Sequence, residues 1–285
     1  MFMFIAYGQQ ALRMGSANGQ DWSQPITDKN NYYLKGCQFA QGRFLAFATY
    51  GNKILFFETD DGKSWEQLSE QKIDSRLHDI AYGNDRFLII GGDMDGHSSS
   101  VMISPDGKTW EGPQKFDKQP LLLRVAFGNG QFVAVGVKGR VAVSQEGTAW
   151  KDAEPLPELD TFIDIAYGNG VYVGAGLHGL RMTSKDGLVW THRQTGLEGE
   201  HINSLLFTGE QFVGIGLGAT YFSADGQSWK RVENENAPET ACYGNDLYVG
   251  SAWKGRILTS KDAIHWQETL RAPEHVNGIT FGKKE

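Results

Sequence analysis

A seven-residue motif recurs from end to end of this chain and limits the folds that the chain can adopt. In its clearest copy, residues 184–190, a serine precedes an Asp-Gly pair and a tryptophan closes the motif. Similar copies begin at Ser16, Thr59, Ser104, Ser144, Ser223 and Ser260. The closing tryptophans follow one another at intervals of about 40 residues, and a period of that length on strand-like segments predicts a propeller or a solenoid.

Each copy is interpreted as a tight turn between two strands. The Asp or Asn side chain accepts hydrogen bonds from backbone groups two residues further on, and the following Gly supplies a positive φ. The tryptophan opens the next strand and buries a large apolar surface. The motif therefore needs no ligand to explain it, and we assign most copies a structural role. The last copy carries Ala263 in place of Gly, so its turn is expected to be strained or differently shaped.

One complete repeat spans residues 164–194 and reads as four short strands joined by Gly, Asn and Asp turns, which is typical of a propeller blade. The chain ends on a first strand, residues 278–282, and begins with a second strand, residues 1–7. We therefore predict an all-β, seven-bladed β-propeller of four-stranded antiparallel blades, forming a single domain over residues 1–285. A composite blade would close it, with its inner strand from the C-terminus and three outer strands from the N-terminus.

Composition excludes several classes of function. The formal net charge is −7 and no run of lysine or arginine stands out, which disfavours binding to nucleic acid or to anionic membranes. No apolar run reaches membrane-spanning length, so no membrane insertion is expected. The two cysteines, Cys37 and Cys242, are interpreted as buried thiols rather than a disulfide framework. The first residues lack the basic flank and the cleavage site of a signal peptide.

The Ser-x-Asp-Gly-x-x-Trp repeats, each preceded by a segment such as residues 166–172, resemble the Asp-box (BNR-type) propellers of the sialidase-like superfamily over the whole chain. The usual box has one residue between Asp and Gly, which this chain lacks. Sialidases also carry an Arg-Ile-Pro segment, and the nearest match here is Arg256-Ile257-Leu258, so sialidase catalysis is not expected. The resemblance implies a place among carbohydrate-active enzymes, lectins or assembly-factor propellers, and it slightly favours a secreted or periplasmic location.

Polar residues that differ from repeat to repeat occupy comparable places just before the first strands. They are Lys35, His78, Asp79, Arg124, Asp164, Asn203, Ser204, Glu239 and Asn277. In a propeller, these places lie at one mouth of the axial channel, where clustered charges shift one another's pKa and hold a polar ligand. The alternative, favoured for any single member, is a solvated channel with counter-charges.

The loops between second and third strands add Tyr50, His178 and Trp253. Trp253 lies outside the turn motif, and it either stacks on a sugar, anchors a partner or packs within the fold. We therefore name as ligand-binding candidates Lys35, Tyr50, His178, Asn203, Trp253 and Asn277.

The leading hypothesis is a propeller that binds a carbohydrate or a protein at the mouth of its channel. One alternative is a glycoside hydrolase or polysaccharide lyase that uses Asp79, Asp164 or Glu239 as acid or base, assisted by His78 and Arg124. The other alternative is an assembly-factor scaffold. The sequence holds no phosphate-binding loop, His-Glu-x-x-His or Cys-x-x-Cys motif. We expect no cofactor, no metal and a monomer.

Overall fold

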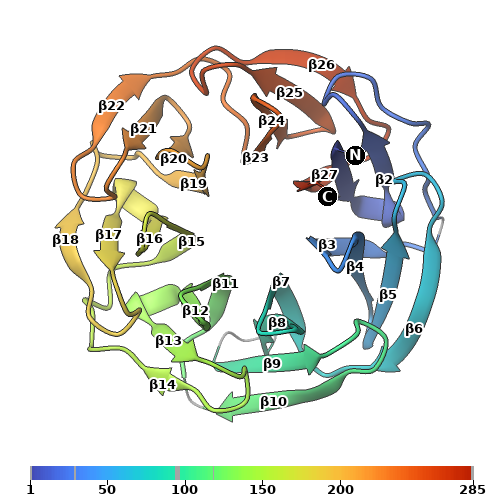
Figure 1. Ribbon diagram of the computed structural model, residues 1–285, viewed down its shortest axis with the longest axis horizontal. Coiled ribbons are helices and arrows are strands. Elements are labelled where there is room, and N and C mark those ends of the chain that lie inside the picture. Colours follow the sequence, from blue (N-terminus) through green and yellow to red (C-terminus); the bar gives the residue numbers. More distant parts are fainter. Residues whose placement is uncertain (1, 29, 94–96, 118, 284–285) are drawn as a thin grey trace. The chain divides into compact units, whose positions relative to one another are not determined.

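The computed structural model describes residues 2–28, 30–93, 97–117 and 119–283 and is all-β (Figure 1). Seven antiparallel blades have a propeller arrangement, and we call the first strand of each blade its inner strand. The predicted fold class is confirmed. By its contacts the chain divides into two compact units: residues 1–74, 107–109 and 236–285 form the first, and residues 75–106 and 110–235 form the second. The single-domain assignment stays a prediction.

The first unit contains three of the blades. One blade comprises β3 (Tyr33–Ala40), β4 (Arg43–Tyr50), β5 (Lys53–Thr59) and β6 (Glu66–Lys72). Another comprises β23 (Thr240–Gly244), β24 (Leu247–Ala252), β25 (Arg256–Ser260) and β26 (Gln267–Arg271). The third is the composite blade, which joins β27 (Val276–Lys283), β1 (Phe2–Gly8) and β2 (Arg13–Ser16). The 3-10 turn η1 (Gln9–Ala11) lies between β1 and β2.

The second unit contains four consecutive blades. The strands of the first two are β7 (Arg76–Gly83), β8 (Arg86–Gly92), β9 (Ser98–Ser104), β10 (Glu111–Asp117), β11 (Leu122–Gly128), β12 (Gln131–Gly136), β13 (Val141–Ser144) and β14 (Lys151–Asp152). Those of the next two are β15 (Phe162–Gly168), β16 (Val171–Gly176), β17 (Arg181–Ser184), β18 (Thr191–Gln194), β19 (Ile202–Phe207), β20 (Phe212–Gly216), β21 (Ala219–Ser223) and β22 (Lys230–Glu233). Two 3-10 turns, η2 (Val137–Gly139) and η3 (Leu177–Gly179), connect second to third strands.

The composite blade pairs the two ends of the chain. Strand β27 runs antiparallel to β1, and the rings of Phe4 and Phe281 lie 4.8 Å apart across this pairing. The expected third N-terminal strand is reduced to two isolated bridges, Arg13 to Ile26 and Ser16 to Trp22. Pro25 explains the difference, because proline has no N–H to donate to a strand ladder.

The recurrent motif forms the expected turn. In the 184–190 copy, Gly187 has φ +73° and donates its N–H to Ser184 Oγ at 2.8 Å, while Trp190 Nε1 donates to the Gly187 carbonyl at 2.8 Å. Hydrogen bonds from the backbone N–H groups of Val189 and Leu188 hold the pKa of Asp186 below its usual value. These contacts fix the turn without any ligand.

The variant copy keeps the same turn. Ala263 has φ +59°, and Trp266 Nε1 still donates to its carbonyl at 3.2 Å. The expected change of shape is therefore not seen, and the strain takes the form of an alanine in the left-handed region, which costs about 1 kcal/mol.

Neighbouring blades of each unit interlock through glycine at the end of the inner strand. A Cβ added to Gly128 would fall well inside contact distance of the Tyr167 ring on the next inner strand. The same relation joins Gly83 to Phe127 and Gly168 to Phe207 in the second unit, and Gly244 to Phe281 and Gly282 to Phe39 in the first. Each ring therefore packs flat against the backbone of the preceding blade.

Both cysteines are free thiols, and burial raises the pKa of each. Cys37 is buried and Cys242 is half-buried on the inner strand β23. In the described part of the chain, no helix is both long and apolar enough to cross a membrane.

Ending the chain at Arg271 removes β27 and should lower the melting temperature by more than about 10 °C, because the buried Val276 and Ile279 are lost along with Phe281. Thermal unfolding followed by circular dichroism measures this change. A chain ending at Lys283 keeps the strand and is the control. Equal melting temperatures for both chains would contradict the structural role of the composite blade.

Candidate functional site

Six of the seven inner strands begin with a β-bulge, and the bulge divides the candidate residues on them into two sets. The register shifts between Leu77 and Asp79 in β7, and equivalent shifts occur in β3, β11, β15, β19 and β27. The candidates at the bulge itself are Lys35, His78, Asn203 and Asn277. Those directly after it are Asp79, Arg124, Asp164 and Ser204. From the sequence, both sets were expected at one comparable place in the repeat; the structure separates them by one residue.

Glu239 lies just before β23, where its N–H donates to the Ser251 carbonyl at 2.8 Å. Its side chain is exposed, in contrast to the half-buried carboxyl groups of Asp79 and Asp164. Glu239 belongs to the first unit and the two aspartates to the second.

In the second unit, Asp79, Arg124 and Asp164 occupy equivalent positions on the inner strands β7, β11 and β15. The guanidinium of Arg124 acts on both carboxylates. Burial is the largest effect and raises the pKa of Asp79 above its usual value, against the opposing effect of Arg124. Burial likewise raises the pKa of Asp164 to about 6, opposed by Arg124 and reinforced by the charge of Asp79. The three side chains form one row across successive inner strands, in which the basic group of Arg124 lies between the two acidic groups.

Both aspartates are engaged by backbone groups. Asp79 Oδ2 accepts the N–H of Val125 at 2.9 Å, and Asp164 Oδ2 accepts the N–H of Leu205 at 2.7 Å. Asp164 Oδ1 also accepts the N–H of Ile165 at 2.9 Å. Each carboxylate therefore ties its own inner strand to that of the next blade, which explains its position without a substrate.

Asn277 makes the same kind of tie in the first unit. Its Nδ2 donates to the Leu34 carbonyl at 2.7 Å and so links β27 to β3. This contact gives Asn277, named as a ligand-binding candidate, a structural role at the bulge.

Aromatic side chains gather on the loops of the first unit. Tyr50 is 47% exposed at the end of β4, and its ring meets Tyr32 edge-on at 5.3 Å. Lys35 Nζ lies 5.6 Å from the centre of the Tyr33 ring. Trp253, between β24 and β25, is 62% exposed and packs against His275 at 5.0 Å. Of these residues, Lys35, Tyr50 and Trp253 were named from the sequence as ligand-binding candidates.

His178 is exposed at η3 in the second unit and pairs with a residue that the sequence analysis missed. Its backbone N–H donates to His201 Nδ1 at 3.0 Å, and the two rings are 5.5 Å apart. His201 lies just before β19, in the kind of loop that the sequence analysis searched. Asn203 is half-buried two residues further on.

The clearest functional signal is the distribution of large exposed apolar side chains. Among the described residues they are Tyr33, Tyr50, Leu159, Val189, Leu197, Leu217 and Trp253. All except Val189 lie in, or at the edge of, loops that lead into an inner strand or join second to third strands. Sequence reasoning missed the three leucines because a lone leucine in a polar loop carries no periodicity.

Three surface hollows of the described residues lie beside the recurrent turns. One of about 530 Å³ is lined by Arg43, Glu58 and Trp65 beside the first unit's 59–65 turn, and Arg43 Nε pairs with Glu58 at 2.6 Å. Hollows of about 370 and 210 Å³ lie beside the 144–150 and 184–190 turns. They recur with the structural motif, and we therefore assign them to the blade architecture.

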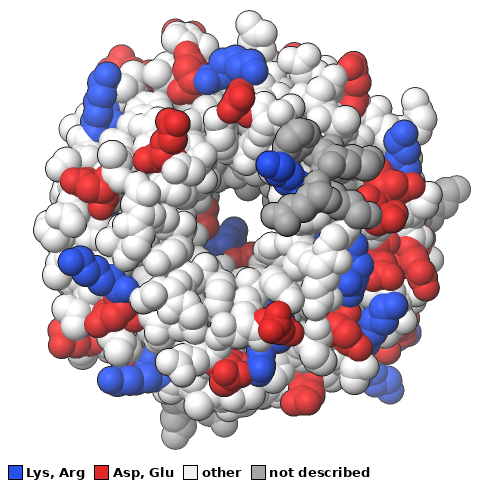
Figure 2. Space-filling model, viewed as in Figure 1, with Lys and Arg blue, Asp and Glu red and all other residues white. Residues whose placement is uncertain are grey.

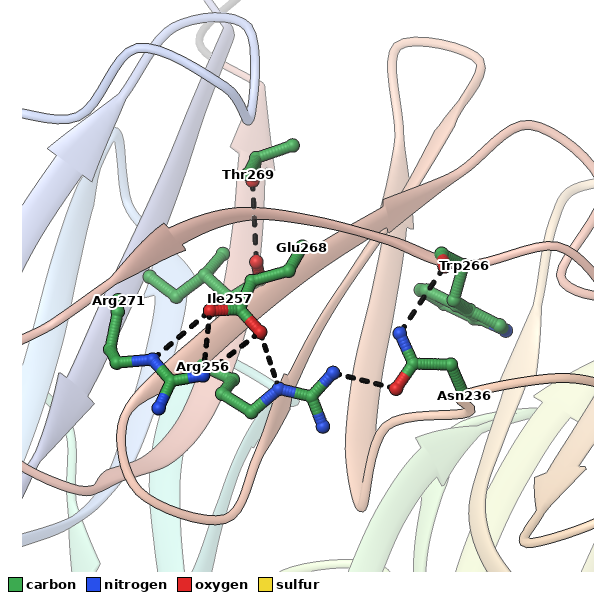
Figure 3. A network of polar contacts seen from close by, with 7 residues as sticks. All are labelled: Asn236, Arg256, Ile257, Trp266, Glu268, Thr269 and Arg271. Atoms are coloured by element: carbon green, nitrogen blue, oxygen red, sulfur yellow. Dashed lines mark hydrogen bonds and ion pairs between the residues drawn. The ribbon is translucent and has the colours of Figure 1, made fainter.

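Arg256, the sequence's nearest approach to the sialidase motif, is held in a network on the outer strands (Figure 3). Its Nε contacts Glu268 Oε2 at 2.6 Å and its Nη2 donates to Asn236 at 2.6 Å. Glu268 also accepts from Arg271 at 2.9 Å, and these two arginines hold the pKa of Glu268 below its usual value. Arg256 is therefore a strand-linking residue.

Over the face in Figure 2, acidic and basic side chains are interspersed rather than gathered by sign. In the described residues, no group of three or more His, Cys, Asp or Glu side chains is arranged to hold a metal ion.

Solved structures of other propellers resemble this chain. They include virginiamycin B lyase from Staphylococcus aureus (TM-score 0.66, 8% identity, 82% of this chain and 83% of that chain) and YCF48 bound to a D1 peptide (0.64, 18%, 93% and 85%). Sqt1 from Saccharomyces cerevisiae also resembles it (0.66, 12%, 93% and 82%). At these identities the likeness shows the fold alone. No family model matches the chain, and no curated protein matches it.

Because the folded-state pKa of Asp164, about 6, lies above its unfolded value, the folded state binds the extra proton between about pH 4 and 6. The contribution of Asp164 to stability therefore falls as pH rises through this window.

Carbon-13 NMR titration should show that Arg124→Gln raises the pKa of Asp164 and that Asp79→Asn lowers it. Asp225, whose pKa is held at about 2 by its turn, is the internal control. Shifts in the same direction, or none, would contradict the proposed row.

Proposed function

We propose that this chain is a protein-binding β-propeller of the Asp-box type that acts as a single domain. Its partner would dock on the loops at the end of the blades where the inner strands begin. The hydrogen-bonded Ser-x-Asp-Gly-x-x-Trp turns support the Asp-box assignment. The function would then be recognition of another protein, as a ligand or as a component of an assembly.

The gathering of exposed apolar side chains in these loops carries the proposal. Leu159 is 90% exposed, Leu217 76% and Leu197 61%, although burial of a leucine side chain is worth about 2 kcal/mol. Scattered single exposures need no explanation, but six of the seven among the described residues lie in loops at the same end of the blades, which favours an interaction surface. Loops held by a rigid scaffold are also the usual place for binding residues.

The structural neighbours are compatible with this function. The structure of YCF48, 18% identical to this chain, holds a D1 peptide, so a propeller of similar fold binds a protein segment. The leucines would act as apolar anchors, and His178 and Asn203 would supply polar contacts beside them.

A carbohydrate is the second candidate ligand, and Trp253 is the observation that favours it. Its exposed ring, together with that of Tyr50, offers the flat apolar face on which sugar rings stack. These aromatic side chains belong to the first unit, whereas the exposed leucines belong to the second. Lys35 lies near Tyr33 and would donate hydrogen bonds to a polar ligand.

The glycan-active enzyme is the weaker alternative. It needs an acid and a base free to act on a substrate, whereas Asp79 and Asp164 each accept a backbone N–H from the neighbouring blade. Glu239 is exposed and comes from a different unit. We therefore assign no catalytic role to these carboxylates or to His78 and Arg124.

A variant with Leu159, Leu197 and Leu217 all changed to serine should lose partner binding by at least about 100-fold, because three apolar anchors are removed. Quantitative pull-down from extracts of the source cells, followed by affinity measurement with each recovered protein, measures this loss. Val189→Ser is the matched control, since Val189 is exposed in a turn at the other end of its blade.

Proteins recovered equally by the wild type and the triple variant would contradict the proposal. A glycan array, probed with the wild type and with Trp253→Ala, tests the second candidate. Glycan binding that depends on Trp253, with no protein lost in the leucine variant, would replace protein recognition by carbohydrate recognition.

A further inference from the structure

We infer that the partner presents a basic segment with large apolar side chains, and that this segment docks on the second unit. The inference rests on the proposed function and adds the chemistry of the partner. The docking surface, named here the leucine loops, consists of residues 137–139, 156–160, 177–179, 195–201, 217–218 and 233–235.

The leucine loops form one continuous series of contacts. Gly139 N–H donates to the Asp160 carbonyl at 2.6 Å, and Leu177 N–H donates to the Thr161 carbonyl at 3.1 Å. Gly196 N–H then donates to the His178 carbonyl at 2.8 Å, and the His178–His201 contact joins the same two loops.

The series continues to the 217–218 hairpin. Glu200 accepts from Arg231 and from the Tyr221 hydroxyl, on strands β22 and β21. Asn234 N–H donates to the Gly218 carbonyl at 3.3 Å. The exposed leucines are therefore carried by loops that brace one another, so a partner meets a preorganised surface.

The charge of the leucine loops is strongly one-sided. Two of their acids are neutralised within the fold: Asp160 pairs with Arg193 at 2.7 Å and Glu200 with Arg231 at 2.5 Å. Four further acids have exposed side chains, namely Glu158, Glu198, Glu233 and Glu235. Lys138 is the single lysine or arginine in these segments. Of the four acids, Glu233 lies at 3.9 Å from Arg231, which is already held by Glu200.

The acidic charge of the leucine loops favours one class of binding partner over others. Complementary charge steers a basic partner to an acidic rim, and like charge repels an acidic one. A second copy of this chain would place carboxylates against carboxylates, and nucleic acid is excluded for the same reason. The segments contain no phenylalanine, tyrosine or tryptophan, the large rings on which a sugar would stack. A basic segment with leucine-sized side chains satisfies both the apolar centres and the acidic rim.

Selection from a random twelve-residue peptide library displayed on phage tests the inference with the full chain as bait. We expect selected peptides to be enriched in Lys and Arg together with Leu, Ile, Phe or Met. Synthetic peptides from the selection should bind about tenfold more weakly to Glu158→Lys/Glu198→Lys/Glu235→Lys, and more weakly at high salt. Glu210→Lys, exposed in a hairpin at the opposite end of its blade, is the charge control and should leave binding unchanged.

The possible outcomes test the basic partner and protein recognition independently of each other. Enrichment of acidic or uncharged peptides whose binding is lost in the triple leucine variant would overturn the basic partner and leave protein recognition standing. Peptides that bind the triple leucine variant as well as the wild type would overturn both. Basic peptides that bind the lysine variant undiminished would overturn the role of the acidic rim.

Discussion

The packing of an aromatic ring against a glycine of the preceding blade is the contact on which the rest of this structure depends. In the second unit it joins three successive pairs of inner strands, with Gly128 and Tyr167 at the centre. Tyr167 also packs against Tyr172 of its own blade, with ring centres 4.7 Å apart, and Tyr172 donates its hydroxyl to the Gly128 carbonyl. One glycine thereby brings two blades close enough for their side chains and backbones to interact directly.

This close approach explains why the inner row is occupied by structural contacts. Once neighbouring inner strands lie in contact, a carboxylate after the bulge reaches the backbone N–H of the next strand, as Asp79 and Asp164 do. These two carboxylates are thus engaged in holding blades together. Under the proposed function, recognition would use the loops, where Leu159 and its neighbours lie exposed on a braced scaffold.

The sequence predicted the parts of the structure that repeat. The 184–190 turn, the four-strand blade and the pairing of the chain's two ends all follow from turn chemistry and spacing, and the structure contains each of them. It predicted less well the features set by single residues. The bulge adds one residue without altering the repeat length. The spacing in the sequence therefore made Lys35 and Asp79 look equivalent, although Lys35 lies at the bulge and Asp79 directly after it. Exposure of the leucines depends on how loops brace one another, which no local pattern records.

The most direct test of the account is the free energy of unfolding measured for Gly128→Ala, Tyr167→Ala and the double variant. Gly128 has no left-handed φ, so an added Cβ acts through its collision with the Tyr167 ring. The account predicts that Gly128→Ala costs about 3 kcal/mol when Tyr167 is present and less than about 1 kcal/mol when Tyr167 is already replaced by alanine, a coupling of about 2 kcal/mol. Additive effects of the two substitutions would show that the blades do not interlock through this contact.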